Sequence, residues 1–490
     1  MNCNQKYLSK NIYSSIEFCS WYLSSHPRKA TVFVTLSLVL ILLVGQNNVF
    51  KIPIITGAKA IRHKTSSQAP SSNEGNTLQS SSSIPSNTAS PVGCINYNSS
   101  TRTITVGCSS ARLTDINNKL HDSSILSKQS PNGIWFLSAN LLIAKGAVFH
   151  IDPTDTKWLK INSKVIGSVA KTSSAYYIDI HGSMIIDSVK ITSWDPTTNY
   201  YAITNGSRTG IGQFILGAPR PGIIIEKDAT GPTNIMNSEI AYLGYEGGKH
   251  LGASGFAYSG GEGSILKNDN IHHVYFGFYS IGVGHMIIEN NIIRNSGHYG
   301  LDPHTGTHDM IIRNNTIYDN NGSGIICSLN CYNILIEKNK VHDNAENGID
   351  FSRNMTNSIA RNNIVYNEPS GIFVSQSHND QIYNNTISKN RAGININSGS
   401  TNNKMYDNTI MNSKSRAILI NNGSSGNTFT ANKIVSSTPE GLKIVQDSTS
   451  KNIFSDNQIV APGETSTKEA EPASNGNTVK HAPNKKTSTE

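Results

Sequence analysis

The 490-residue sequence is poor in charged side chains, in aromatic side chains and in long helical patterns. Charged residues make up 15% of the chain and aromatic residues 7%. No stretch carries the hydrophobic spacing of a long amphipathic helix, which argues against a fold built from long helices. Glycine, asparagine and serine are frequent instead, and these residues favour turns. The composition therefore predicts an all-β protein with many turns and short stacked strands.

Motifs of nucleic-acid recognition are also missing. The sequence has no zinc-finger spacing, no RNP-like aromatic motif and no dense stripe of lysine or arginine. The formal net charge is nevertheless +8, which suits an anionic partner such as nucleic acid, anionic lipid or an acidic polysaccharide. Charge alone does not choose among these partners, but the missing motifs argue against nucleic acid.

Cysteine is scarce, and its six residues show no metal-binding pattern. Cys94 and Cys108 bracket a predicted hairpin and should form a disulfide if this part of the chain lies outside the cell. Cys327 and Cys331 could pair or bind a metal, but no second Cys or His pair lies nearby at metal spacing, so we favour two core thiols. Aspartate-rich nonapeptide repeats that bind Ca²⁺ are absent. The sequence assigns no metal and no cofactor.

One uncharged apolar run, residues 31–45, has the character of an export segment. It is short for a membrane span, which needs about 20 residues, but the stretch before it is long for a cleaved signal peptide. We favour an uncleaved membrane anchor over residues 31–48, with residues 1–30 in the cytoplasm and the rest in an extracellular or periplasm-like space. Cleavage would instead give a secreted protein.

Low-complexity segments flank the predicted folded part. Residues 65–90 and residues 461–490 hold too few apolar side chains to offset the entropy of ordering, so we expect a disordered linker over residues 49–90 and a disordered tail over residues 461–490. Between them we expect an N-terminal cap over residues 91–138 and a repeat domain over residues 139–460.

The predicted domain repeats with a period in the low twenties. Asparagine recurs in steps of 22 to 25 residues, at positions 291, 315, 339, 363, 385, 408, 432 and 457. In phase with it, a small residue heads a short apolar strand, as in GFYS, GLDPH, GIIC, GIDF and GIFV. This period predicts a right-handed parallel β-helix of about twelve coils. Inward side chains would form its core, and stacked asparagines would hydrogen-bond along the axis.

Alternation along these strands gathers ionisable side chains on one face. The second and fourth residues after each small residue point outward, which puts Asp302 and His304 on one solvent-facing surface. Tyr279 would lie one coil before them and Asp350 two coils after. A single Asp or Tyr on such a face is usually only solvated, so the prediction of a site depends on the cluster.

The stretch YGLDPH, residues 299–304, resembles the signature of alginate (mannuronan) C5-epimerases. Further segments resemble those of the periplasmic bacterial enzymes in the same order: ANLLIAKGAVFHID, ITSWD, EIAYLGY, YFGFYS, SGII and GIDFSRN. The resemblance covers roughly residues 135–430 and implies a right-handed parallel β-helix.

The resemblance further implies that the protein removes the C5 proton of a uronate within a polymer and returns a proton to the opposite face. Such chemistry needs a base, an acid and a cation or hydrogen-bond donors on the substrate carboxylate. By resemblance, His304 is the base, Tyr299 a second proton-transfer group, and Asp302 the residue that orients or tunes His304. The candidate substrate-binding residues are Tyr279, Asp350, Arg353, Arg220 and Lys249.

Two positions depart from the family pattern. Thr305 follows the DPH where the family has an acidic residue, and Leu329 stands where the periplasmic enzymes have an arginine. Arg353 matches a different family arginine and would have to reach about 5 Å along the groove to replace the missing one. Two alternatives therefore stay open, a polyuronate lyase and a non-catalytic carbohydrate-binding β-helix. In each case we expect a monomer whose partner is an acidic polysaccharide.

Overall fold

The computed structural model describes residues 93–164, 175–203, 219–246, 251–446 and 451–460, and two short strands near the C-terminus. The chain divides into two compact units, Met1–Pro85 and Ser86–Glu490, and every described residue belongs to the second. The predicted cytoplasmic segment, anchor and linker, residues 1–90, lie outside the described residues. No helix in the described ranges is long and apolar enough to cross a membrane.

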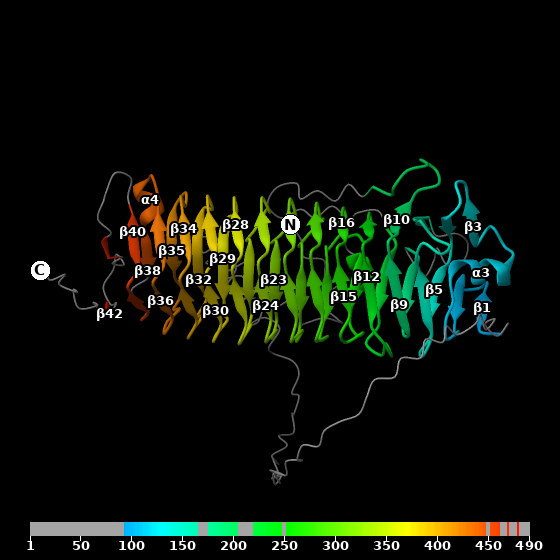
Figure 1. The fold of residues 1–490 in the computed structure, drawn as a ribbon, viewed down its shortest axis with the longest axis horizontal. Coiled ribbons are helices and arrows are strands. Elements are labelled where there is room, and N and C mark those ends of the chain that lie inside the picture. Colours follow the sequence, from blue (N-terminus) through cyan, green and yellow to red (C-terminus); the bar gives the residue numbers. More distant parts are fainter. Residues whose placement is uncertain are drawn as a thin grey trace, which may run out of the picture. The chain divides into compact units, whose positions relative to one another are not determined.

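Three long sheets, called here the first, second and third sheet, make up this unit (Figure 1). The first sheet consists of β1 (Ile95–Asn98), β2 (Thr103–Val106), β5 (Asn140–Ile143), β8 (Tyr177–Ile180), β11 (Gly222–Ile225), β14 (Phe256–Tyr258), β17 (Tyr279–Ile281), β20 (Asp302–His304), β23 (Ile325–Ser328), β26 (Ile349–Ser352), β29 (Ser370–Ser375), β32 (Ala392–Asn397), β35 (Arg416–Ile420) and β38 (Ile444–Gln446).

The second sheet consists of β3 (Leu126–Gln129), β4 (Ile134–Leu137), β7 (Trp158–Asn162), β10 (Lys190–Trp194), β13 (Glu239–Ala241), β16 (Asn270–His272), β19 (Ile292–Arg294), β22 (Thr316–Tyr318), β25 (Lys340–His342), β28 (Ile364–Tyr366), β31 (Thr386–Ser388), β34 (Thr409–Met411), β37 (Lys433–Val435), β40 (Gln458–Val460) and β41 (Lys468–Glu469).

The third sheet consists of β6 (Val148–Ile151), β9 (Ser183–Asp187), β12 (Thr233–Met236), β15 (Ile265–Lys267), β18 (Ile287–Glu289), β21 (Ile311–Arg313), β24 (Leu335–Glu337), β27 (Ile359–Arg361), β30 (Gln381–Tyr383), β33 (Lys404–Tyr406), β36 (Thr428–Thr430), β39 (Ile453–Ser455) and β42 (Thr478–Val479). The helices are α3 (Leu113–Leu120), the 3-10 helix η3 (Leu251–Ser254) and α4 (Pro439–Leu442).

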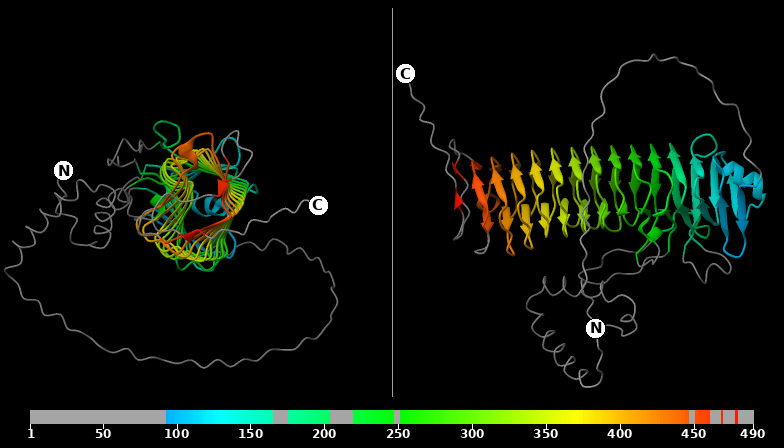
Figure 2. Two further views of the ribbon diagram at one scale, coloured as in Figure 1. Left: turned by 90° about the vertical axis from the view of Figure 1, so that its left-hand side faces the viewer. Right: turned by 90° about the horizontal axis from the view of Figure 1, so that it is seen from below.

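These strands form the predicted right-handed parallel β-helix. The chain enters the three sheets in turn, and each strand pairs in parallel with the strand one coil away, except in the hairpins β1–β2 and β3–β4 and the pair β40–β41. Seen end-on, successive coils lie behind one another (Figure 2). Twelve strands remain in each sheet when both hairpins, β41 and β42 are set aside, which agrees with the predicted number of coils.

Inward β-branched side chains form a continuous core along the axis. In the second sheet, Ile293, Ile317, Val341 and Val365 occupy one row of neighbouring strands and are fully buried. Branched side chains restrict their own rotamers and pack well on a pleated surface. Burial of each contributes about 1.5–3 kcal/mol, which makes the core the main source of stability.

The predicted asparagine ladder runs beside this core. Nδ2 of Asn315 donates to Oδ1 of Asn339 at 3.0 Å, and Nδ2 of Asn339 donates to Oδ1 of Asn363 at 3.1 Å. The backbone N–H groups of Asn315 and Asn339 donate to the same two oxygens. Buried amides thus satisfy one another from coil to coil, which confirms the predicted register.

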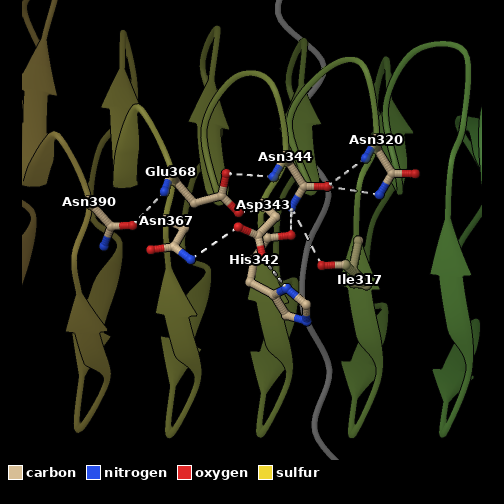
Figure 3. Close-up of polar contacts among 8 residues, drawn as sticks. All are labelled: Ile317, Asn320, His342, Asp343, Asn344, Asn367, Glu368 and Asn390. Carbon is tan, nitrogen blue, oxygen red and sulfur yellow. Dashed lines mark hydrogen bonds and ion pairs between the residues drawn. The ribbon is translucent and has the colours of Figure 1, made fainter.

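Two further polar ladders contain carboxyl groups. One ladder joins Asn320, Asn344, Glu368 and Asn390 (Figure 3). The other begins at Asp380 and continues through Asn403, Asn427 and Asn452. Burial raises the pKa of Glu368 to about 8 and that of Asp380 to about 8. The sequence analysis missed both ladders.

Residues of the predicted N-terminal cap add strands to the sheets and also cover the end of the β-helix. The hairpin β1–β2 starts the first sheet, and a disulfide joins Cys94 and Cys108 across its base with 5.1 Å between the Cα atoms. Helix α3 buries Leu113 and Ile116 in the core cluster. These apolar contacts protect the end of the stacked coils from solvent.

Candidate active site

The predicted site lies on four neighbouring strands of the first sheet, β17, β20, β23 and β26. The register pairs Tyr279 with Asp302, and Ile326 of β23 with Asp350. Because β23 follows β20 directly, Tyr279 lies one coil before Asp302 and Asp350 lies two coils after it. Asp302 and His304 share the outer side of β20, as strand alternation predicts.

The prediction that these side chains lie in solvent is wrong. Asp302 is 2% exposed and Asp350 is 6% exposed, and His304 is half-buried. Aromatic side chains pack beside His304, since the ring of Tyr279 lies 5.6 Å from that of His304 and 5.1 Å from that of Phe276. Alternation gives the side of the sheet on which a residue lies, but it does not say which large neighbours cover that residue.

His304 lies between a hydroxyl group and a guanidinium group. Its Nδ1 is 2.5 Å from Oγ1 of Thr305, and its Nε2 is 3.4 Å from Nη2 of Arg353. Burial and the charge of Arg353 lower the pKa of His304 to about 4. The imidazole is therefore neutral near pH 7 and can accept a proton.

Asp302 does not hold His304 by a hydrogen bond. Oδ1 of Asp302 is buried without a hydrogen-bond partner, and the group that meets Nδ1 of His304 is the hydroxyl of Thr305. Burial raises the pKa of Asp302 well above its usual range, although Arg353 opposes that shift. Burial therefore favours the protonated form of this side chain.

Arg353 reaches back over one coil to the coil of His304. Thr305, Leu329 and Arg353 stack at one corner with φ values of 35°, 61° and 55°. From this corner the exposed Arg353 donates from Nη2 to Oγ of Ser328 at 2.9 Å. The guanidinium thus lies beside His304 although the nearer corner position holds Leu329. The sequence analysis gave Ser328 no role. The feature that could have revealed it is a hydroxyl group at the outward position next to His304.

Tyr299 lies at the corner that leads into β20 and packs against Gly322. A Cβ atom added at Gly322 would lie 2.8 Å from Cε1 of Tyr299, so the glycine makes room for the ring. Burial raises the pKa of Tyr299 above its ordinary value, and it does the same for Tyr279. Both phenols keep their protons at neutral pH and can donate hydrogen bonds.

Asp350 adds a second buried acid to the groove. Burial raises its pKa to about 7, while a hydrogen bond of 3.0 Å from Nδ2 of Asn347 to its Oδ2 opposes that shift. Asp350 therefore titrates close to neutrality. Asn347 is a further contact that the sequence analysis did not name.

Arg220, another predicted substrate-binding residue, does not join this group. Arg220 precedes β11, three strands before β20 in the first sheet, and it is 5% exposed. Its Nε donates to the carbonyl of Gly244 and its Nη2 to that of Leu243, at 2.5 and 3.2 Å. This arginine holds backbone carbonyl groups at a corner. Lys249 lies outside the described residues.

Known proteins share this architecture. Residues 202–331 and 326–459 match the family model described as "Right handed beta helix region". A curated mannuronan C5-epimerase of Pseudomonas syringae pv. tomato is 27% identical over 192 residues, which are 37% of this chain and 32% of that protein. The match thus spans about a third of the length of that relative.

Two solved structures extend the likeness in fold. The crystal structure of the periplasmic alginate epimerase AlgG aligns with a TM-score of 0.58 and 21% identity, and covers 78% of this chain and 85% of that chain. A double mutant of AlgG aligns with a TM-score of 0.59, with the same identity and coverage. At these identities the likeness concerns the fold.

Proposed function

Since the chain belongs to the right handed beta helix family, we propose that it is a C5-epimerase acting on a mannuronan-like polyuronate. The observation that carries this proposal is the neutral imidazole of His304 beside the guanidinium of Arg353, with the protonated phenol of Tyr279 next to the imidazole. The name of the Pseudomonas syringae relative supports the same reaction.

In this proposal, Arg353 binds the carboxylate of the reacting uronate. The C5 proton is weakly acidic because its loss places a second negative charge next to the carboxylate, so a cation on that group lowers the barrier. Arg353 is exposed and is held by Ser328 in reach of His304, which suits it for this task. A carboxylate paired with Arg353 would also cancel the charge that helps to lower the pKa of His304, and the imidazole would become a stronger base.

His304 then takes the C5 proton, and Tyr299 supplies a proton to the opposite face of the ring. The phenol of Tyr299 keeps its proton because burial raises its pKa. Each turnover leaves His304 protonated and Tyr299 ionised, so protons must move through solvent or the groove to restore both groups. Burial raises the pKa values of Asp302 and Asp350, and in their protonated forms both can donate hydrogen bonds as charge develops.

The test is proton NMR of polymannuronate and other uronans incubated with the full chain in D₂O. We expect deuterium at C5 and signals of the inverted sugar. Ultraviolet absorbance of unsaturated ends would instead indicate a lyase, in which the C5 carbanion expels the C4 substituent. Binding of a uronan without any exchange at C5 would contradict both enzymes and leave a carbohydrate-binding protein.

The proposed substrate also suggests where the protein works. We propose that the β-helix lies in an extracellular or periplasm-like space and that residues 31–48 anchor the chain in a membrane, because that apolar run follows basic residues. Fractionation of the full chain and of a chain lacking residues 1–50 tests the anchor. Only the full chain should pellet with membranes.

A further inference from the structure

A second cluster of ionisable side chains lies outside the groove, where the chain turns from the first sheet to the third. His285, on the turn between β17 and β18, meets His308 and Asp309, on the turn between β20 and β21. One donor atom from each of the three residues lies within 4.8 Å of the others. The turn that carries His308 and Asp309 directly follows His304.

At this corner, the coils of His285 and Asp309 carry other residue types than the later coils do. Backbone hydrogen bonds stack His285, Asp309, Asn333 and the residues after them, all with positive φ between 50° and 63°. Asparagine suits this left-handed conformation, and it fills the corner in the later coils at 333, 357 and 379. In the coils of His285 and Asp309, the same backbone position carries an imidazole and a carboxylate, which are stronger metal ligands.

His308 and Asp309 are already held in place. The ring of His308 stacks on that of Tyr332, with 5.0 Å between centroids and 10° between planes. Nδ1 of His308 lies 2.8 Å from Oδ2 of Asp309, and Oδ1 of Asp309 accepts from Nδ2 of Asn333 at 3.0 Å. The side chains of His308 and Asp309 are 23% and 35% exposed, so an ion can reach them from solvent.

A glycine and a further carboxylate complete the surroundings. Gly284 lets the groups come close, because a Cβ atom there would lie 2.6 Å from Nδ1 of His308 and 3.1 Å from Oε2 of Glu262. The backbone N–H of Gly284 donates to both carboxylate oxygens of Glu262 at 3.1 Å. Glu262 therefore adds negative charge next to Gly284, on the side of the His308 imidazole.

We propose that His285, His308 and Asp309 bind a divalent transition-metal ion of the Zn²⁺ class. Two imidazole nitrogens and one carboxylate oxygen suit Zn²⁺, Ni²⁺ or Cu²⁺, whereas Mg²⁺ and Ca²⁺ prefer oxygen ligands throughout. Ligand atoms lie about 2.0–2.2 Å from Zn²⁺, so the exposed His285 has to close by a small movement. Water or Glu262 would fill the remaining position.

The ion would fasten together the turns of two neighbouring coils. One of these turns is tied to the strand of His304, because Oγ1 of Thr307 donates to the carbonyl of His304 at 2.8 Å. The ion is therefore structural and stiffens the turn next to the groove. This site does not depend on the proposed reaction.

The test is calorimetric titration of the untagged full chain, stripped with EDTA, with ZnCl₂ and separately with CaCl₂. We expect one tightly bound Zn²⁺, no comparable binding of Ca²⁺, and a higher melting temperature with Zn²⁺ than with EDTA. Three substitutions each introduce the residue type that a later coil carries at the same corner, so the turn should still fold: His285→Asn, Asp309→Asn and His308→Thr.

Each of these variants should bind Zn²⁺ about 10–100-fold more weakly than the unchanged chain, or more weakly still. His378→Thr is the matched control, because His378 occupies the corner row of His308 three coils later, and it should bind Zn²⁺ as the unchanged chain does. Melting with EDTA verifies that each variant is folded. The proposal is overturned if the unchanged chain binds no Zn²⁺, if Ca²⁺ binds equally well, or if the three variants keep full affinity.

Discussion

Burial shifts the ionisable residues of the candidate site towards their uncharged forms. Raised pKa values favour the protonated forms of Asp302 and Tyr299, and His304 is neutral near pH 7 because its pKa is lowered to about 4. Arg353 is exposed and charged beside them. A substrate carboxylate would therefore meet a single positive charge at the edge of a set of neutral acids and a neutral base.

His304→Ala should lower C5 deuterium exchange by about 10²–10⁴-fold, since it removes the positioned base. It should change the free energy of unfolding by no more than about 1 kcal/mol, because the imidazole is only half-buried and Arg353 keeps its bond to Ser328. NMR exchange and thermal melting measure the two effects. His342→Ala, on the second sheet, is the control and should exchange normally; undiminished exchange in His304→Ala would refute the mechanism.

Arg353→Ala should lower kcat/KM by about 10²–10³-fold, since the substrate carboxylate loses its cation. The arginine also helps to lower the pKa of His304. For the unchanged chain, kcat/KM should rise as the pH passes through about 4, where His304 loses its proton. In Arg353→Ala this rise should move to higher pH.

Two companion variants show whether charge is what matters at this position. Arg353→Lys should retain part of the activity. Leu329→Arg in the Arg353→Ala chain should restore part of it, because Leu329 occupies the same corner one coil nearer to His304. If the rise of kcat/KM near pH 4 did not move in Arg353→Ala, the proposed effect of Arg353 on the pKa of His304 would be contradicted.

At the scale of the strands and their turns, hydrogen-bond ladders fix the coils in register. Asn339 accepts from N and Nδ2 of Asn315, and it donates from Nδ2 to the carbonyl of Ile312 and to Oδ1 of Asn363. Every one of these groups is inaccessible to water when the coils are stacked. A change at one position therefore removes hydrogen bonds from groups on both neighbouring coils.

Asn339→Leu should destabilise the protein by about 1–3 kcal/mol, because it leaves the backbone N–H of Asn315 unpaired in the interior, while Nδ2 of Asn315 keeps only its hydrogen bond to the carbonyl of Ile288. Lys340→Leu introduces the same side chain at the next residue, which is exposed, and it should change stability by no more than about 0.5 kcal/mol. Urea denaturation of both variants measures the difference. Equal denaturation midpoints would mean that the ladder contributes little to stability.

The sequence predicted the elements better than it predicted the site. A coil returns to the same corner after 22 to 25 residues, so identical asparagines at that corner reveal the fold directly. The ladder through Asn344 and Glu368 mixes residue types and hides the same period. In the groove, the burial of Asp302 and the reach of Arg353 depend on side chains from neighbouring coils, and a strand pattern does not contain that information.

For the whole molecule, the ladders also make stability depend on pH. The buried carboxyls of Asp269, Glu368 and Asp380 have pKa values of about 7, 8 and 8, each raised by burial. A group whose pKa is higher in the folded chain contributes stability that is complete below its unfolded pKa of about 4 and is lost as the pH rises through the folded value. His273 and His304, with folded pKa values of about 4, act in the opposite direction, and only below about pH 6.5. As the pH rises from 6.5 to 8.5, these carboxyls should therefore lower the free energy of unfolding.

Asp380→Asn should reduce the loss of stability that occurs as the pH rises. Oδ1 of Asp380 accepts from the backbone N of Ser358, while Oδ2 is buried without a hydrogen-bond partner. At the next coil, Asn403 instead donates from Nδ2 to the carbonyl of Ser377. An amide at 380 would supply a similar donor and could not ionise, so the variant should be more stable than the unchanged chain at pH 8.5, on the order of 1–3 kcal/mol.

The two chains should become similar in stability near pH 5, where Asp380 is protonated. Melting curves at pH 5, 6.5 and 8.5 measure the difference, and Asp407→Asn, the same substitution at an exposed corner, is the control that should not change it. If Asp380→Asn melted at or below the temperature of the unchanged chain at pH 8.5, the carboxylate would be stabilised within the ladder. The pH dependence would then have to come from the other buried acids, Asp269 and Glu368 in the ladders and Asp302 and Asp350 in the candidate site, whose pKa values burial also raises.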